Sequence, residues 1–142
     1  MRILVMGGTL FVGRHFAEAA LARGHSVTLF NRGRRGPELF PRVEKLRGDR
    51  DGDLSALHGR EFDAVFDPSA YKPEQVESVI ATLGGRAGHY TFISSVSAYG
   101  TFPPGRAYDE DTPLAPGSEG YGPLKARCEE ALETALPGRA AS

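Results

Sequence analysis

The segment that decides the fold is Ile3-Leu4-Val5-Met6-Gly7-Gly8-Thr9-Leu10-Phe11-Val12-Gly13. Its first four residues form a continuous apolar run, which is typical of a parallel strand buried on both faces. Over residues 10–23 the apolar side chains recur near helical spacing, and Gly24 can cap the end of that helix. The glycine pair predicts a tight turn, so the chain opens with a strand, a turn and a helix.

The same alternation continues along the chain. Further strands are predicted at residues 26–30, 43–46, 63–66 and 89–94, and further helices at residues 53–58, 74–83 and 123–136. This pattern predicts an α/β fold, a doubly wound parallel sheet of strand order 3-2-1-4-5. Only residues 139–142 follow the last helix and its Pro137-Gly138 stop, so no sixth strand is expected to cover the fifth.

Composition limits the class of protein. The chain has 142 residues, 40% of them hydrophobic and 25% charged, which fits a single globular domain and excludes a disordered chain. A net charge of −1 disfavours a globally basic nucleic-acid binder. The single cysteine, Cys128, excludes a domain held by internal disulfides. No early apolar run is long enough for a signal peptide or a membrane span, so a cytoplasmic domain is expected.

The charge is unevenly distributed. Residues 1–50 carry a net charge of +6 and residues 51–142 a net charge of −7. Seven of the ten early basic residues lie between Arg32 and Arg50. A solvated, arginine-rich surface loop would explain this cluster. The alternative is a pocket for a small polyanion such as a phosphate.

The turn after the first strand favours the phosphate pocket. Residues without a Cβ allow a backbone to approach a ligand closely, and the start of a helix presents free N–H groups to an anion. A nucleotide is therefore expected to bind at the seven residues of this turn: Gly7, Gly8, Thr9, Leu10, Phe11, Val12 and Gly13.

The end of the second strand indicates which dinucleotide binds. An NAD site usually has an acidic residue here, but this chain has Asn31 followed by Arg32, and Arg35 lies close behind. Because arginine pairs well with a 2′-phosphate, NADP is predicted in preference to NAD. Asp49 and Arg50, after the third strand, are expected to contact the cofactor. Asp49 would accept from the adenine amino group, unless it is an ordinary loop carboxylate.

Candidate catalytic residues lie in the second half of the chain. Tyr121 and Lys125 are four residues apart at the start of the last helix, so both side chains can face one site, where an ammonium would stabilise a phenolate. Ser95 follows the fifth strand, at the edge where open α/β sheets bind ligands. The alternatives are a surface contact for the Tyr–Lys pair and a capping role for the serine.

Taken in order, these segments resemble the short-chain dehydrogenase/reductase superfamily, on its extended NAD(P)-dependent epimerase/dehydratase side. GGTLFVG, SSVSAYG and YGPLK are similar to the cofactor loop, the serine segment and the Tyr-x-x-x-Lys segment of that family, and DEDTP at residues 109–113 resembles the loop before its tyrosine. The resemblance implies a Rossmann-like domain over residues 1–142, corresponding to the N-terminal half of a family member and ending after the active-site helix. The substrate-binding half is not part of it.

The resemblance also implies roles for individual residues. Tyr121 would be the acid/base, Lys125 would hold the nicotinamide ribose, and Ser95 would orient the substrate. Close approach to the cofactor is implied for Pro68, Ser69 and Ala70. Leu10 departs from the family pattern because it replaces the middle glycine, which requires the pyrophosphate to sit further out or the loop to shift.

Several functions remain open from the sequence. One is an oxidoreductase or epimerase that transfers hydride to or from a substrate such as a nucleotide-sugar. Another is a non-catalytic module that binds NADP(H) or RNA, and a third is an inactive fragment of such an enzyme. A homodimer is predicted through the helices at 74–83 and 123–136, with pairing along the open edge of the fifth strand as a second route and a monomer as the alternative.

Overall fold

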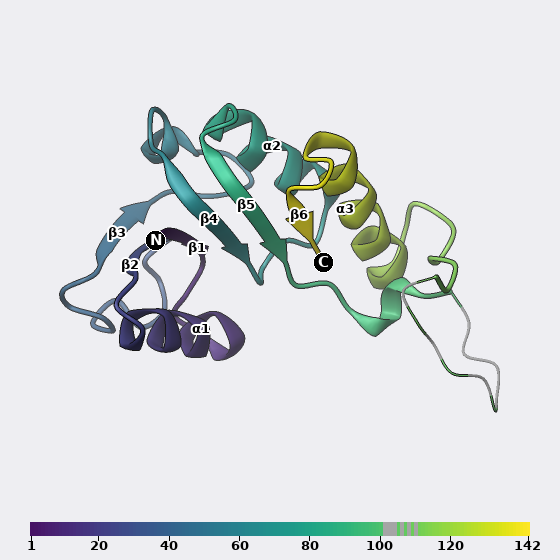
Figure 1. The fold of residues 1–142 in the computed structure, drawn as a ribbon, viewed down its shortest axis with the longest axis horizontal. Helices are drawn as coiled ribbons and strands as arrows, with labels where there is room; N and C mark the ends of the chain where they lie inside the picture. The colour runs from purple at the N-terminus through teal and green to yellow at the C-terminus, as the bar shows by residue number, and fades with distance from the viewer. Residues whose placement is uncertain (101–104, 106, 108, 110) are drawn as a thin grey trace.

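The N-terminal strand, turn and helix form as predicted. The computed structural model describes residues 1–100, 105, 107, 109 and 111–142. Strand β1 (Arg2–Met6) enters the glycine turn, and helix α1 (Phe11–Ala22) leaves it (Figure 1). Gly24 follows α1 with φ 77°, a left-handed conformation that reverses the chain toward the next strand.

The predicted sheet order is confirmed and extended by one strand. The six strands lie in the order β3-β2-β1-β4-β5-β6, and every neighbouring pair is parallel. The remaining strands are β2 (Ser26–Asn31), β3 (Glu44–Arg47), β4 (Phe62–Asp67), β5 (Ala87–Phe92) and β6 (Ala140–Ala141). In the centre of the sheet, Val5 of β1 lies between Leu29 of β2 and Phe66 of β4.

The expectation that the fifth strand ends the sheet is wrong. Ala140 pairs with Tyr90 and Ala141 with Thr91, while the Tyr90 amide donates to the carbonyl of Arg139 at 2.9 Å. The Arg139 guanidinium also donates to the carbonyl of Ala87. A two-residue strand that pairs mainly through backbone hydrogen bonds is too short to leave a hydrophobic pattern in the sequence.

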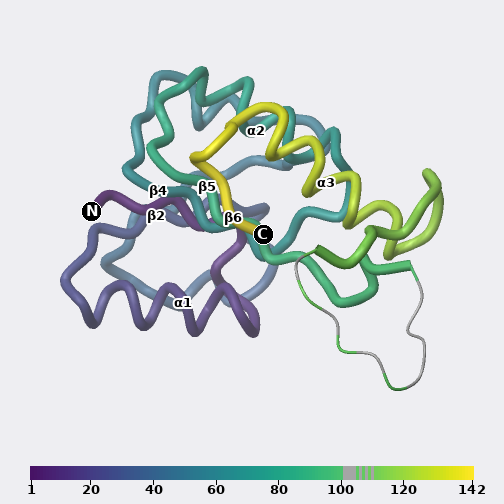
Figure 2. Tube along the Cα trace, turned by 45° about the vertical axis from the view of Figure 1, so that its right-hand side comes forward, coloured from purple at the N-terminus to yellow at the C-terminus, as the bar shows by residue number. Residues whose placement is uncertain are grey.

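Helices cover both faces of the sheet. Helix α1 lies on one face, and α2 (Pro73–Leu83) and α3 (Tyr121–Ala135) lie on the other (Figure 2). Successive β1 side chains alternate between the two cores, because neighbouring residues of a strand point to opposite faces. Ile3 and Val5 pack in the α1 core, and Leu4 and Met6 pack in the core under α2 and α3.

Element boundaries shift slightly from the prediction. The helix expected at residues 53–58 is a short 3-10 turn, η1 (Ser55–Leu57), and a second 3-10 turn, η2 (Val96–Ala98), follows β5. Helix α3 begins at Tyr121, two residues earlier than expected. Part of the DEDTP segment, Glu110, lies outside the described residues. Among the residues that are described, no helix has both the length and the apolarity to cross a membrane.

Candidate functional site

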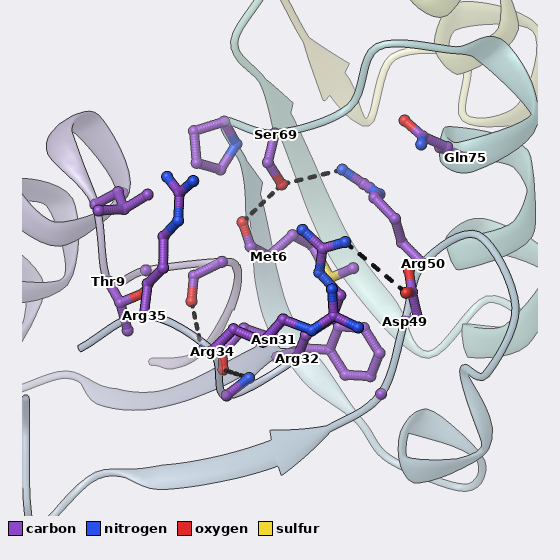
Figure 3. A pocket seen from close by; sticks show the side chains of 18 of the residues that line it. Met6, Thr9, Asn31, Arg32, Arg34, Arg35, Asp49, Arg50, Ser69 and Gln75 are labelled. Atoms are coloured by element: carbon purple, nitrogen blue, oxygen red, sulfur yellow. Dashed lines mark hydrogen bonds and ion pairs between the residues drawn. The ribbon is translucent and has the colours of Figure 1, made fainter. Parts of the chain in front are cut away.

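A cavity of about 650 Å³ opens at the carboxyl ends of β1, β2 and β4 (Figure 3). The strand order reverses here, because the chain passes from β1 to β2 on one side and to β4 on the other, and open α/β sheets bind ligands at such a point. Of the residues predicted to bind the cofactor, all but Ala70 and Lys125 line this cavity.

The glycine loop is closely packed against the sheet. Gly7 and Gly8 have φ values of 105° and 83°, which other residues rarely adopt. A Cβ on Gly8 would lie 2.5 Å from Cδ2 of Leu29, and a Cβ on Gly13 would lie 3.0 Å from the Gly8 nitrogen. The Asn31 amide donates to the Gly7 carbonyl at 3.0 Å, which fixes the loop to the end of β2.

The start of α1 presents uncompensated positive potential to the cavity. Its N-cap, Leu10, has extended backbone (φ −134°, ψ 147°) and makes no side-chain capping bond, and the first turn of Phe11–Ala22 holds no acidic residue. Phe11 takes the left-handed conformation, with φ 35°. The free N–H groups of a helix start carry partial positive charge, so this end of the cavity attracts an anion.

Arginines form the opposite wall of the cavity. Nη1 of Arg32 lies 4.0 Å from Oδ2 of Asp49, and both side chains are largely exposed. The side-chain Oδ1 of Asn31 accepts from the Gly33 amide at 2.8 Å and from the Arg47 guanidinium, so Asn31 shapes this loop as well as the glycine loop. The position where an NAD site usually has a carboxylate therefore holds a fully engaged neutral amide.

The floor of the cavity is a buried ionic network that the sequence did not predict. Arg50 donates to both oxygens of Asp67, at 3.0 and 2.6 Å, and to Oγ of Ser69 at 3.0 Å. Asp67 also accepts from the Tyr90 hydroxyl at 2.7 Å and from the Ser69 amide at 3.0 Å. Ser69 donates to the carbonyl of Met6 at 3.1 Å. The network thus joins the ends of β1 and β4, the loop after β3, and β5.

The contacts within this network determine which of its side chains are charged. Burial alone would raise the pKa of Asp67, but the charge and hydrogen bonds of Arg50 outweigh burial, so the pKa lies below its usual value. The pKa of Tyr90 is raised well above its usual value by burial and by the Asp67 carboxylate. Asp67 is therefore the anion and Tyr90 the neutral hydrogen-bond donor. The only sequence signal for this network was Asp67 at the end of an apolar strand.

Lys125 is a buried residue that joins helix α3 to the sheet. It is 3% exposed, and its Nζ donates to the carbonyl of Ala70 at 3.1 Å and to that of Ile93 at 2.6 Å. The same Nζ lies 4.0 Å from the ring centroid of Phe92. Burial lowers the pKa of the Lys125 ammonium. A surface contact is thus excluded for this lysine, and its side chain ties α3 to the ends of β4 and β5.

Tyr121 lies beside a second tyrosine. Its side chain is half exposed, and its ring centroid lies 5.9 Å from that of Tyr71. Tyr71 lines the cavity, and its ring centroid lies 5.8 Å from Nζ of Lys125. The sequence prediction missed Tyr71, which connects the cavity with both Tyr121 and Lys125. A tyrosine four residues beyond the end of a strand carries no signal of this kind by itself.

Ser95 has a capping role in this structure. Its Oγ accepts from the Ser97 amide at 3.1 Å and so begins the η2 turn. This turn packs on the start of α3, where a Cβ on Gly122 would lie 2.0 Å from the carbonyl oxygen of Ser97. Ser95 lines a second cavity of about 740 Å³ beside the C-terminal half of α3, and neither Tyr121 nor Lys125 lines that cavity.

The first cavity has the properties required for an elongated anionic ligand. Its volume lies within the usual range for small-molecule sites. One end has the glycine loop and the start of α1, the other has Arg32 and Asp49, and Tyr71 in the lining lies beside Tyr121. The residues present therefore fit a dinucleotide, with its phosphates toward the loop and the arginines.

Comparison with known proteins identifies relatives that are about twice as long. No family model matches the chain. It is 30% identical to the UDP-glucose 4-epimerase of Neisseria meningitidis, over 92% of this chain and 47% of the relative. It is 31% identical to the dTDP-6-deoxy-L-talose 4-dehydrogenase (NAD(P)(+)) of Kitasatospora kifunensis, over 95% and 48%. A chloroplast stem-loop binding protein of Arabidopsis thaliana is 32% identical, over 69% and 30%. The chain thus spans at most about half the length of these curated relatives.

Solved structures show the same relationship. The UDP-glucose 4-epimerase of Thermus thermophilus, in complex with NAD, superposes with a TM-score of 0.78 at 27% identity, over 94% of this chain and 50% of the other. The dTDP-glucose 4,6-dehydratase of Bacillus anthracis, also with NAD, shares the fold with a TM-score of 0.77 over 99% of this chain and 53% of the other. The homologues and structural neighbours of this chain are thus members of the NAD-dependent epimerase/dehydratase family of the short-chain dehydrogenase/reductase superfamily, and the chain matches their N-terminal half.

Proposed function

We propose that the chain binds a nicotinamide dinucleotide in the 650 Å³ cavity and prefers NADP(H) to NAD(H). One observation carries this proposal: a glycine loop and an uncapped helix start face a wall of arginines, and no carboxylate stands at the end of β2. Arg32 is free to pair with a ribose 2′-phosphate once it leaves Asp49, at 4.0 Å. The UDP-glucose 4-epimerase of Thermus thermophilus, whose structure contains NAD, supports a nicotinamide dinucleotide as the ligand.

In an assembly that also contains substrate contacts, the function we infer is oxidoreduction or epimerisation of a nucleotide-sugar. A bound nicotinamide dinucleotide would supply hydride transfer. Tyr121 would exchange a proton with a substrate hydroxyl. Ser95 could orient that hydroxyl only for a substrate that reaches from Tyr121 to the second cavity, which Ser95 lines. Lys125, held by two carbonyls, would place a cation behind Tyr71 and Tyr121.

Calorimetry with NADPH and NADH tests the binding proposal directly. We expect both dinucleotides to bind, NADPH more tightly than NADH. If neither dinucleotide binds, the proposal is refuted.

A turnover screen on UDP- and dTDP-sugars tests the proposed chemistry. If turnover is found, Tyr121→Phe should lower it by about 10²–10⁴-fold, because only the proton-transferring group is lost, while NADPH affinity stays the same. Undiminished turnover in this variant would show that Tyr121 is not the acid/base.

A non-catalytic binding module is the second candidate. Two observations favour it: Nζ of Lys125 is engaged by backbone carbonyls, and Ser95 serves as a cap. The ligand would be NADP(H) or, given the similarity to a stem-loop binding protein, RNA. NADPH binding without turnover would identify the module, and a gel-shift with an RNA stem-loop, repeated with NADPH as competitor, would show whether RNA uses the same cavity. A fragment that binds neither ligand would be inactive by itself.

A homodimer through α2 and α3 completes the proposal. Most apolar residues of the two helices already pack within the chain, but Ile80, Leu124 and Ala131 remain partly exposed. Direct pairing along the edge of β5 is excluded because β6 occupies that edge. Light scattering at low micromolar concentration tests the assembly. A monomer mass that does not change as concentration rises would reject the dimer.

A further inference from the structure

The arginine loop (residues 32–36) reaches two separate parts of the cavity. Arg32 points across the cavity to Asp49, on the side where β2 and β3 end, whereas Arg35 extends past Thr9 toward the start of α1 (Figure 3). Gly36 of this loop lies beside the glycine loop, since a Cβ on Gly36 would lie 3.6 Å from Cβ of Thr9. The two arginines therefore face opposite ends of one cavity.

The start of α1 requires an additional positive charge. Leu10 stands where a glycine would allow close approach, and its side chain is 52% exposed at the edge of the cavity. A pyrophosphate displaced outward by this side chain lies further from the N–H groups of α1, so those groups stabilise it less. A flexible cation on the outer side of the glycine loop can offset that loss. Figure 3 shows Arg35 on this side, beside Thr9.

We propose that Arg35 binds the pyrophosphate of the dinucleotide, in compensation for Leu10, while Arg32 alone recognises the 2′-phosphate. This inference rests on the proposed function, because it assigns two phosphates of one ligand to two arginines. It predicts that the arginine loop contributes both to general affinity, through Arg35, and to the choice of cofactor, through Arg32.

Four ligands separate these roles by calorimetry: NADPH, NADH, ADP-ribose and 2′-phospho-ADP-ribose. Arg35→Ala should weaken all four by a similar factor of about 10, the loss expected for one charge-assisted contact, because every ligand contains the pyrophosphate. Arg32→Ala should weaken only the two 2′-phosphorylated ligands. Arg35→Lys should recover part of the affinity, and Arg42→Ala, which removes an exposed arginine outside the cavity, is the matched control.

The outcomes distinguish the two proposals. If the unmodified chain binds none of the four ligands, the proposed function fails and this inference fails with it. If the chain binds them but Arg35→Ala changes none of the affinities, Arg35 is a solvated residue. Selective weakening of NADPH and 2′-phospho-ADP-ribose by Arg35→Ala would instead assign Arg35 to the 2′-phosphate. In the double variant the two effects should add, since the arginines contact different groups.

Discussion

Two Arg–Asp ion pairs lie at the same cavity, and they differ in almost every physical respect. Arg50 lines the floor and pairs with Asp67 beneath it, with N and O atoms 2.6 Å apart and side chains 12% and 0% exposed. Arg32 and Asp49 form part of the wall, 4.0 Å apart and 56% and 41% exposed. Asp49 and Arg50 are neighbours in sequence, so two adjacent residues enter opposite environments.

This difference shows that burial decides whether an Arg–Asp pair stabilises the fold or stays available to a ligand. A buried carboxylate that loses its partner leaves an uncompensated charge, so removing one member of the floor pair destabilises the native fold. An exposed pair is screened by water and contributes little to stability, so its arginine remains available to a ligand. The floor therefore holds the shape of the cavity, and in the proposed function the wall selects the ligand.

Breaking the floor pair should have the largest effect. We expect Asp67→Asn to lower the free energy of unfolding by about 3–5 kcal/mol, because Arg50 is left buried without its counter-ion. Arg50→Met should cost a comparable amount, and the double variant less than the sum of the two. Urea unfolding measures all three. Additive losses would show that the two residues stabilise the fold independently.

Replacing Arg32 of the wall should change the selectivity between NADPH and NADH and leave the free energy of unfolding unaltered. Arg32→Ala is expected to remove most of the difference in affinity between NADPH and NADH, on the order of 1–3 kcal/mol, because the charge-assisted contact with the 2′-phosphate is lost. The urea midpoint should stay at its original value. Equal affinities for NADPH and NADH in the unmodified chain would contradict the assignment.

Acid should weaken the floor pair selectively. Because the folded pKa of Asp67 lies below its value in the unfolded chain, near 4, its contribution to stability is complete above about pH 4. That contribution is lost as the pH falls through the folded pKa. The difference in free energy of unfolding between the original chain and Asp67→Asn should thus narrow with decreasing pH. A difference that stays constant down to pH 2 would mean that the carboxylate is not the stabilising form.

The smallest effect on the free energy of unfolding is expected when Asp49, the carboxylate of the wall pair, is replaced. Asp49→Asn should change the free energy of unfolding by less than about 1 kcal/mol, since the pair that it breaks is mostly solvated. It is also the matched control for Asp67→Asn, because both variants replace an aspartate that pairs with an arginine. A loss as large as that of Asp67→Asn would remove the distinction between floor and wall.

The order of elements and most of the residues that line the 650 Å³ cavity could be predicted from local patterns. The apolar run at residues 3–6, the glycines after it and the arginines after β2 each carry their signal within a few residues. Strand β6 could not be predicted, because its two alanines are held by backbone hydrogen bonds to β5. The contacts of Lys125 and Ser95 could not be predicted either, since spacing gives the face of a helix but not what fills the space opposite.

The sequence by itself determined a parallel α/β domain with an anion-binding turn and a basic loop, because glycine conformation, hydrophobic period and charge act over short distances. Only the tertiary structure decided which charges became buried. Asp67, Arg50 and Tyr90 come from three separate segments, namely the end of β4, the loop after β3, and β5, and only the assembled sheet brings them together. Arg32 stays exposed beside Asp49, because burial is a property of the assembled sheet and not of the local sequence.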